Sequence, residues 1–502
     1  LAGAGASSGM AMAHWEIQGW MILILGWVFV PFYTRSMVYT MPEFLERRYN
    51  PQSRTILSVI SLVSYVLTKV AVTVYAGGLV FQQVFGIKEL WGIDFFWIAA
   101  IGLVVLTALY TIFGGMKSVL YTSVLQTPIL LLGSLIILVL GFKELGGWDE
   151  MMRVCGAVTV NNYGDTMTNL IRSNDDANFP WLGALIGSAI IGFWYWCTDQ
   201  FIVQRVLSGK NEMEARRGTI FGAYLKLLPV FLFLIPGMIA FALHQKYIGA
   251  GGEGFLPMLA NGTANADAAF PTLVAKLLPA GVKGLVVCGI LAALMSSLAS
   301  LFNSSAMLFT IDFYKRFRPE TPEKKLVGIG QVATVVIVIL GILWIPIMRS
   351  VGDVLYTYLQ DVQSVLAPGI AAAFLLGICW KRTSAQGGMW GLIAGMVIGL
   401  TRLGAKVYYS NAGEVADSTF KYLFYDMNWL FFCGWMFLFC IIVVIVVSLA
   451  TKAPTAEKIQ GLVFGTATKE QKAATRASWN HWDIIHTVII LAITGAFYWY
   501  FW

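Results

Sequence analysis

The stretch GILAALMSSLASLFNSS, residues 289–305, is apolar enough to lie in a bilayer, yet it carries five serines and one asparagine. On a helix these polar groups lie within about five turns, and hydrocarbon offers them no hydrogen-bond partner. Ser296, Ser297 and Ser300 place several oxygens on one side of the helix. Such a set of oxygens can hold a small, hard cation such as sodium, so the stretch indicates a cation site.

These serines also have a purely structural explanation, which stays open at this point. Serine and threonine in membrane helices often donate to the carbonyl one turn earlier, or they join two helices by hydrogen bonds. The rest of the chain has to distinguish between the two explanations.

The composition is that of an integral membrane protein. Hydrophobic residues make up 58% of the 502 residues, charged residues 12%, and the mean hydropathy is +0.72. Repeated apolar runs of about twenty residues predict spanning helices and not a barrel, whose strands would alternate. We therefore expect an all-α protein embedded in the lipid bilayer. The net charge of +7 indicates basic cytoplasmic loops and no nucleic-acid partner.

Twelve apolar segments are long enough to span, and a short run overlaps the first of them. This run, LAGAGASSG at 1–9, is too short to span, and we interpret it as the end of a helix whose first part is missing from the sequence. The twelve segments lie at 9–34, 52–85, 92–114, 120–142, 180–205, 216–246, 277–314, 325–349, 352–380, 386–404, 428–450 and 482–502.

Basic residues cluster in every second loop. The loop at 451–481 carries five lysine or arginine residues, whereas the loop at 143–179 is richer in acidic residues. By the positive-inside rule, we predict that 451–481 is cytoplasmic and that 143–179 is extracellular. The same rule places the C-terminus at Trp502 outside a multi-pass protein of the plasma or inner membrane.

Two interrupted helices organise the chain into repeats. The segment 180–205 carries three glycines before a polar cluster at 197–200 and, like the run at 1–9, it is typical of a broken helix. If each opens a five-helix unit, the two units are inverted relative to each other. The predicted parts are a first repeat at 1–142, an extracellular loop at 143–179, a second repeat at 180–381, and additional transmembrane helices at 382–502.

Charged side chains inside the spans are candidate functional groups, because each is costly unless it is paired or hydrated. A carboxylate, an amide and an ammonium around one cavity, flanked by the rings of Trp15, Tyr195 and Trp196, can bind a polyhydroxylated solute. The charged candidates and one neutral amide are Glu16, Lys69, Asp199, Lys226, Asp361 and Gln360.

The same charged residues allow two other interpretations. Glu16 with Lys226, or Lys69 with Asp361, can form buried ion pairs that fix helix register. A membrane enzyme acting on lipid-linked sugars could use Glu16 and Asp199 as catalytic carboxylates.

Several ordered motifs are spread over nearly the whole chain. They include GWVFVPFY at 26–33, TMPEFLERRY at 40–49, YTIFGGMKSV at 110–119, WYWCTDQFIVQR at 194–205, MSSLASLFNS at 295–304 and FLLGICWKR at 374–382. This set resembles the sodium/solute symporter family, and within it the sodium/glucose and sodium/galactose cotransporters. The resemblance implies a LeuT-like core of two inverted five-helix repeats with additional C-terminal transmembrane helices. It also implies alternating access that couples sodium entry to uptake of a monosaccharide such as glucose or galactose.

The resemblance also implies roles for single residues. Half of a sodium site comes from the carbonyl of Ala293 with Ser296 and Ser297, and the other half from residues upstream of this sequence. Tyr195 is the inner gate that stacks on the sugar ring, and Trp15 is another gate-side aromatic. The implied sugar-binding residues are Glu16, Lys226, Gln360, Tyr195 and Trp196.

Departures from the family pattern concern both sites. Gly19 and Gly192 stand where relatives often have a hydroxyl or amide that touches the sugar, which leaves the preferred sugar open. Ser123 stands where the family commonly has an aspartate, on the sodium exit path or in a second sodium site with a serine that matches Ser300. Loss of this charge weakens such a site. We therefore expect a vestigial site at most, and one sodium per sugar.

Two alternatives within the family stay open. One is a symporter for a non-sugar solute, although Glu16 with Gln360 disfavours an anionic one. The other is a sugar sensor, in which binding changes the membrane potential with little uptake. The sequence leaves the oligomeric state of the protein open.

Overall fold

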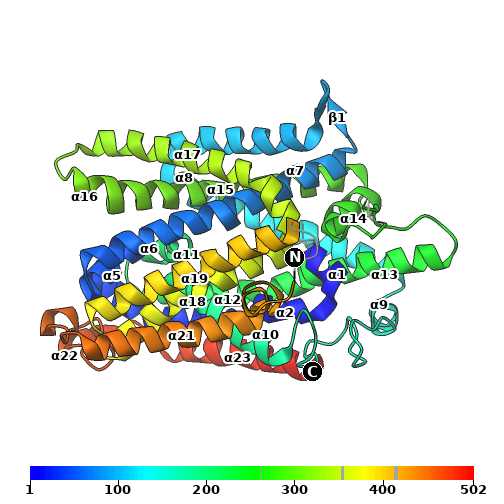
Figure 1. Cartoon of the computed structure of the whole chain (residues 1–502). Coiled ribbons are helices and arrows are strands. Elements are labelled where there is room, and N and C mark those ends of the chain that lie inside the picture. The colour runs from blue at the N-terminus through cyan, green and yellow to red at the C-terminus, as the bar shows by residue number, and fades with distance from the viewer. Residues whose placement is uncertain (260–261, 352–354, 412–415) are drawn as a thin grey trace.

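The computed structural model of the chain describes residues 1–259, 262–351, 355–411 and 416–502. Most of these residues lie in helices (Figure 1), because a helix satisfies its backbone groups internally where lipid offers them no partner. The predicted all-α class is confirmed. Eleven described segments are long and apolar enough to cross a membrane: Ala2–Ser36, Pro51–Phe85, Gln126–Leu145, Trp181–Thr198, Glu212–Gly249, Ala280–Phe317, Glu323–Ile347, Leu355–Cys379, Ala385–Asn411, Trp429–Ala450 and His481–Tyr500.

Short π-helical and 3-10 turns, labelled η, interrupt the longer helices. The N-terminal elements are α1 (Ala2–Ser8), η1 (Gly9–Met12), α2 (Ala13–Glu16), α3 (Gly19–Ile24), η2 (Leu25–Phe29), α4 (Val30–Ser36), α5 (Met41–Arg48), α6 (Pro51–Ser64), η3 (Tyr65–Val70), α7 (Ala71–Phe85), β1 (Glu89–Leu90), β2 (Ile93–Asp94), α8 (Phe95–Leu145) and α9 (Trp148–Gly156). The central elements are α10 (Trp181–Gly192), η4 (Phe193–Thr198), α11 (Gln200–Leu207), α12 (Glu212–Pro229), η5 (Val230–Leu234), α13 (Ile235–Gly249), η6 (Ala266–Ala268), α14 (Ala269–Leu277), α15 (Ala280–Met307), η7 (Leu308–Tyr314), α16 (Lys315–Phe317) and α17 (Glu323–Val351). The C-terminal elements are α18 (Leu355–Cys379), α19 (Ala385–Asn411), α20 (Thr419–Lys421), η8 (Tyr422–Asp426), α21 (Trp429–Ala450), η9 (Ala456–Lys458), α22 (Lys469–Ala477) and α23 (His481–Tyr500).

Each predicted span contains described helix, but two of them share one element. The span predicted at 92–114, from residue 95 onward, and the whole of the span predicted at 120–142 lie in α8, which is 51 residues long. The antiparallel pair β1–β2 before α8 and the helix α9 after it lie at the same end of the molecule (Figure 1). The α8 stretch therefore crosses the molecule twice.

The helix break predicted within 180–205 is confirmed. The helix α10 continues into η4, which ends at Thr198. Asp199 is extended, with φ −78° and ψ 126°, and its carboxylate caps α11 by accepting from the Phe201 amide. A second break separates α2 from α3, where Ile17 and Gln18 leave the helical conformation.

The short helix α1 packs at backbone distance against η5 and the start of α13. A Cβ at Gly5 would lie 2.2 Å from the carbonyl oxygen of Leu234, and one at Gly237 would lie 2.0 Å from that of Ala2. Small residues permit such close approach of membrane helices. The N-terminal run is therefore built into the core of the protein.

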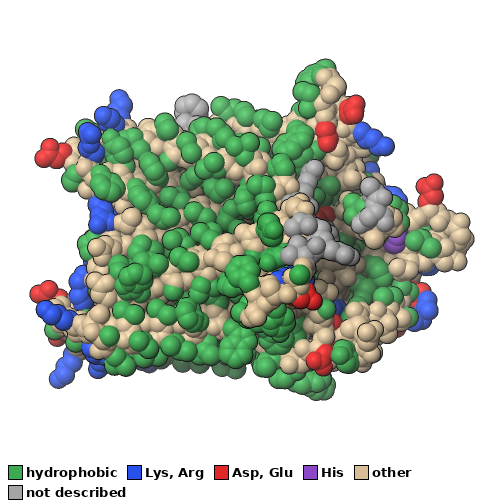
Figure 2. All heavy atoms as spheres, viewed as in Figure 1, with side chains coloured by type: hydrophobic (Ala, Val, Ile, Leu, Met, Phe, Trp, Pro, Cys, Tyr) green, Lys and Arg blue, Asp and Glu red, His purple; other side chains and the backbone are tan. Residues whose placement is uncertain are grey.

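Charged side chains gather at the two ends of the molecule, and the surface between them is mainly hydrophobic (Figure 2). Lysines and arginines line the end formed by α5, α16 and α22, at the left of both views; we call it the basic end. The C-terminus and α9 lie at the opposite end. This apolar belt between charged ends is the pattern of a protein that spans a bilayer.

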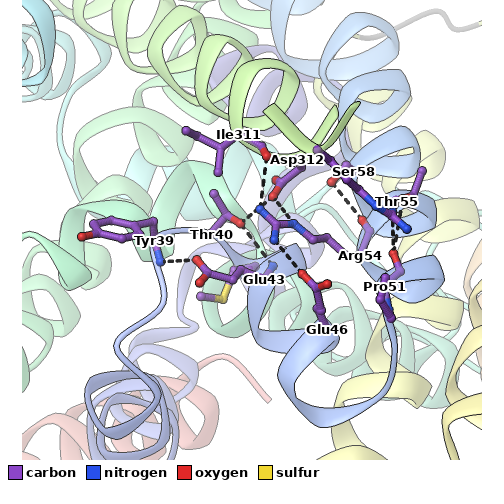
Figure 3. Close-up of polar contacts among 12 residues, drawn as sticks. Tyr39, Thr40, Glu43, Glu46, Pro51, Arg54, Thr55, Ser58, Ile311 and Asp312 are labelled. Atoms are coloured by element: carbon purple, nitrogen blue, oxygen red, sulfur yellow. Dashed lines mark hydrogen bonds and ion pairs between the residues drawn. The ribbon is translucent and has the colours of Figure 1, made fainter. Parts of the chain in front are cut away.

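An ion-pair network ties three elements together at the basic end (Figure 3). Arg54 on α6 donates from Nε to Asp312 Oδ1 on η7 at 2.7 Å and from Nη1 to Glu46 Oε2 on α5 at 2.6 Å. Its Nη2 also donates to the Ile311 carbonyl at 3.2 Å, and Thr40 donates to Asp312 Oδ1 at 3.1 Å. Asp312 has no exposed side-chain surface, so its charge depends on these donors.

We expect Asp312→Asn to destabilise the protein by roughly 3 kcal/mol, because removing one partner of a buried ion pair leaves the other uncompensated. Asp417→Asn is the matched control: Asp417 is 95% exposed beside Lys421, and exposed pairs contribute about 1 kcal/mol or less. The measurement is the thermal unfolding midpoint of the purified protein in detergent. Equal midpoints for the two variants would show that the network contributes little to stability.

Candidate functional site

A cavity of about 170 Å³ lies where α2, η4, α12 and α18 meet. Helices that are far apart in the sequence contribute to it, two of them next to a break: Glu16 ends α2, and Tyr195 lies in η4. The cavity is lined by all six residues for which we predicted solute binding or gating, namely Trp15, Glu16, Tyr195, Trp196, Lys226 and Gln360.

The polar centre of this cavity is the carboxylate of Glu16. Lys226 Nζ donates to Glu16 Oε2 at 2.5 Å, and the Tyr356 hydroxyl donates to Glu16 Oε1. The side chains of Glu16 and Lys226 are only 8% and 13% exposed. The ion pair of Glu16 with Lys226, predicted as one alternative, is confirmed. Because this pair lies in the cavity wall, its presence is compatible with the other interpretation, in which the same two residues bind a solute.

Aromatic rings form much of the remaining wall. Tyr195 and Trp196 meet edge to face with their centroids 5.1 Å apart, and Lys226 Nζ lies 5.3 Å from the Trp196 centroid. Trp15 stacks on Trp429 of α21, with the centroids 5.4 Å apart. One face of Trp15 is therefore covered by the protein itself.

Two buried polar atoms of the cavity residues lack a hydrogen-bond partner among the described residues. They are Oε1 of Gln360, an acceptor, and Nε1 of Trp15, a donor. Buried polar atoms are nearly always paired in proteins. These two atoms are therefore candidates to bond a solute.

The predicted pairing of Lys69 with Asp361 is wrong. Lys69 on η3 pairs with Asp199 at the break before α11, and Asp361 on α18 pairs with Lys406 on α19. The Tyr65 hydroxyl donates to Asp199 at 2.8 Å. The pairs differ from the prediction because η3 lies beside the break and α18 beside α19, a packing that charge alone does not reveal.

A model of the sodium:solute symporter family matches residues 1–395. The chain belongs to the sodium:solute symporter family. It is therefore a sodium-coupled, multi-pass membrane transporter and not an enzyme, as expected from the motifs.

Two proteins that are similar to this chain are named as sodium cotransporters. The sodium/myo-inositol cotransporter 2 of Homo sapiens is 36% identical over 479 residues, which cover 93% of this chain and 70% of the relative. The sodium/glucose cotransporter 1 of Ovis aries is 37% identical over 470 residues, covering 90% and 70%. A solved structure of a substrate-bound, outward-open Na+-coupled sialic acid symporter has a TM-score of 0.68 at 20% identity, covering 90% of this chain and 86% of that one. The expected fold, a LeuT-like core of inverted five-helix repeats, is confirmed.

In this symporter, the residues predicted to hold sodium have different environments. Ser296 is buried, and its Oγ lies 2.5 Å from the Oγ of Ser123 on α8. Ser297 is exposed and Ala293 is half-buried. The two neighbouring serines therefore face different sides of α15, and the sodium assignment of these three residues stays a prediction.

For the next serines along α15 of the symporter, the structural explanation holds. The Ser300 hydroxyl donates to the Ser296 carbonyl at 2.9 Å, and the Ser304 hydroxyl donates to the Ser300 carbonyl at 2.8 Å. The Arg205 guanidinium also donates to Ser300 Oγ. A fixed positive charge beside this hydroxyl repels a cation, which agrees with the expectation that Ser123 and Ser300 form at most a vestigial site.

The sequence analysis missed three polar residues of the cavity, Gln18, Tyr356 and Gln363. Tyr356 lies four residues before Gln360 and Gln363 three after it, so helical spacing places all three on one face of α18 and could have found them. Gln18 has no such signal, because the break between α2 and α3 decides where its side chain lies.

Changing Lys226 to methionine would leave the Glu16 carboxylate buried without its cation. We expect a loss of roughly 3–5 kcal/mol in stability, and loss of solute uptake. The double variant Lys226→Met with Glu16→Gln removes both charges and should recover most of the stability but not the uptake. Thermal unfolding in detergent and uptake into proteoliposomes measure the two effects separately. Full uptake by the double variant would show that the pair is only structural.

Proposed function

We propose that this symporter takes up a monosaccharide or a closely related polyol, driven by one sodium ion per solute. The observation that carries the proposal is the cavity around Glu16. A carboxylate, an ammonium and an amide, held beside the rings of Tyr195 and Trp196, offer hydrogen bonds and apolar faces to a ring that carries several hydroxyls.

The charge balance of the cavity supports a neutral solute. The negative charge of Glu16 is met by Lys226 within 2.5 Å, so an added ion would find no uncompensated counter-charge. An anionic or cationic solute would lose its hydration without an ion pair in return. A polyhydroxylated neutral solute loses less and replaces its water by hydrogen bonds.

The named relatives support the same class of solute. A sodium/myo-inositol cotransporter and a sodium/glucose cotransporter are both more than one third identical to this chain over at least 90% of its length. Their names include a cyclic polyol and a monosaccharide. Both compounds present a ring of hydroxyls of similar size, so the proposal covers the two classes.

Sodium is proposed to bind at Ala293, Ser296 and Ser297, through a carbonyl and two hydroxyls of α15. Coupling requires only that sodium and solute bind more tightly to one of two conformations, and no covalent step is needed. In this scheme Tyr195, next to the break before α11, is the inner gate. Trp15 closes the cavity on the side of Trp429.

The repeats we propose follow from the interrupted helices, and the orientation in the membrane follows from the distribution of charge. Residues 1–142 and 180–381 form the two inverted repeats, and 382–502 adds further spans. The basic end faces the cytoplasm by the positive-inside rule. The C-terminus lies at the opposite end (Figure 1), and thus outside.

We expect a sodium gradient to drive uptake of labelled sugars or polyols into proteoliposomes. Ser297→Ala should abolish the sodium dependence, whereas Gln360→Ala should lower uptake about tenfold or more while sodium still binds, since a lost hydrogen bond to a buried partner costs 1–3 kcal/mol. Ser305→Ala is the control on the same helix, because its buried hydroxyl has no partner among the described residues. Normal uptake by both test variants would refute the site assignment.

We expect one sodium to be transported with each solute. Ser123 brings no charge, and Ser300 is bonded by Arg205, so a second sodium would lack a counter-charge. Combined measurement of current and tracer flux gives the coupling ratio. A ratio of two, or a sodium Hill coefficient near two, would contradict the expectation.

A further inference from the structure

Gly192 lies in the cavity wall at the end of α10, one helical turn before Tyr195. A Cβ at this position would lie 2.5 Å from Oε1 of Gln18, 3.0 Å from its Cδ and 3.1 Å from its Nε2. The space that a side chain at 192 would occupy is therefore filled by the amide of Gln18. A residue from the break between α2 and α3 supplies the polar group at this corner of the cavity.

The amide of Gln18 is held in one orientation. Gln18 is 2% exposed, and its Nε2 donates to the carbonyl of Ser188 on α10 at 2.8 Å. With the nitrogen committed to Ser188, the oxygen is the atom nearest to Gly192. A buried, oriented carbonyl oxygen accepts hydrogen bonds and cannot donate them.

We infer that Gln18, reaching across Gly192, is a specificity-determining residue that accepts a hydrogen bond from one hydroxyl of the solute. The inference rests on the proposed function and narrows it. Glu16 is already bonded by Lys226 and Tyr356, so its oxygens discriminate less between solutes. The oxygen of Gln18 selects a solute with a hydroxyl donor at one ring position and rejects the analogue that lacks it.

Gly192 has a defined part in this arrangement. Any side chain at this position displaces the Gln18 amide, because the clash involves its oxygen, carbon and nitrogen together. Position 192 and Gln18 therefore act as a pair. The small residue at position 192 leaves the space through which the amide of Gln18 reaches the solute.

The test uses sodium-driven uptake of the best-transported solute and of its analogues that each lack one hydroxyl. The wild-type protein should have a KM about tenfold higher for one of these analogues than for the parent, the size of a single lost hydrogen bond. Gln18→Met keeps the side-chain length but cannot accept this bond. It should raise the KM for the parent and abolish the discrimination at that one hydroxyl, with ratios at the other hydroxyls unchanged.

A second pair of variants approaches the same contact from α10. Gly192→Ala should remove the same discrimination by displacing Gln18, and Gln18→Ala with Gly192→Asn should restore it by supplying an amide from the other helix. Gly249→Ala, where an added Cβ meets nothing within 4 Å, is the control and should behave as wild type.

Three results would overturn the inference. An equal change of KM for all analogues, or no change, in Gln18→Met and Gly192→Ala would show that Gln18 only supports the fold. If these variants still discriminated against every analogue as strongly as the wild-type protein does, Gln18 would likewise have only a structural role. Failure of the unmodified protein to take up any sugar or polyol would instead refute the proposed function, and this inference with it.

Discussion

Hydrocarbon offers no hydrogen-bond partner, and this constraint decides where the polar side chains of this symporter lie. Glu16 is buried with Lys226 and Tyr356, and Lys69 is buried with Asp199. A lone charge in a span is costly, so each charge is met by a group from a helix distant in sequence. These pairs hold the spans together, and two polar atoms of the cavity residues, Trp15 Nε1 and Gln360 Oε1, have no partner among the described residues.

Breaks in the helices bring the polar groups to the cavity. The break after Glu16 turns Gln18 toward α10, and the break at Asp199 follows the aromatic residues of η4. An unbroken helix would present such groups along one face only. Breaks are tolerated in a membrane where the freed backbone is buried in protein, as it is here, and transporters of inverted repeats place their sites at such points.

The serines of α15 show two uses of the same chemical group. The hydroxyls of Ser300 and Ser304 donate hydrogen bonds to the backbone carbonyl one turn earlier, and Ser296 contacts Ser123 on the neighbouring α8 stretch. A hydroxyl that donates to the carbonyl one turn earlier is satisfied within its own helix, and one that contacts a second helix joins the two. The exposed Ser297 is the one whose hydroxyl faces outward from this packing, and the proposed sodium site depends on it.

The sequence by itself determined the class of the protein, its spans, the break in 180–205 and the six predicted residues of the cavity. These follow from local properties: apolar runs of spanning length, charges within them, and motifs shared with a family. The sequence also allowed the pair of Glu16 with Lys226, but tertiary structure alone decided the other partners. Lys69 pairs with Asp199 instead of Asp361, and Gln18 fills the space beside Gly192. Such contacts depend on how distant helices pack and where breaks turn the chain, and no local pattern encodes that packing.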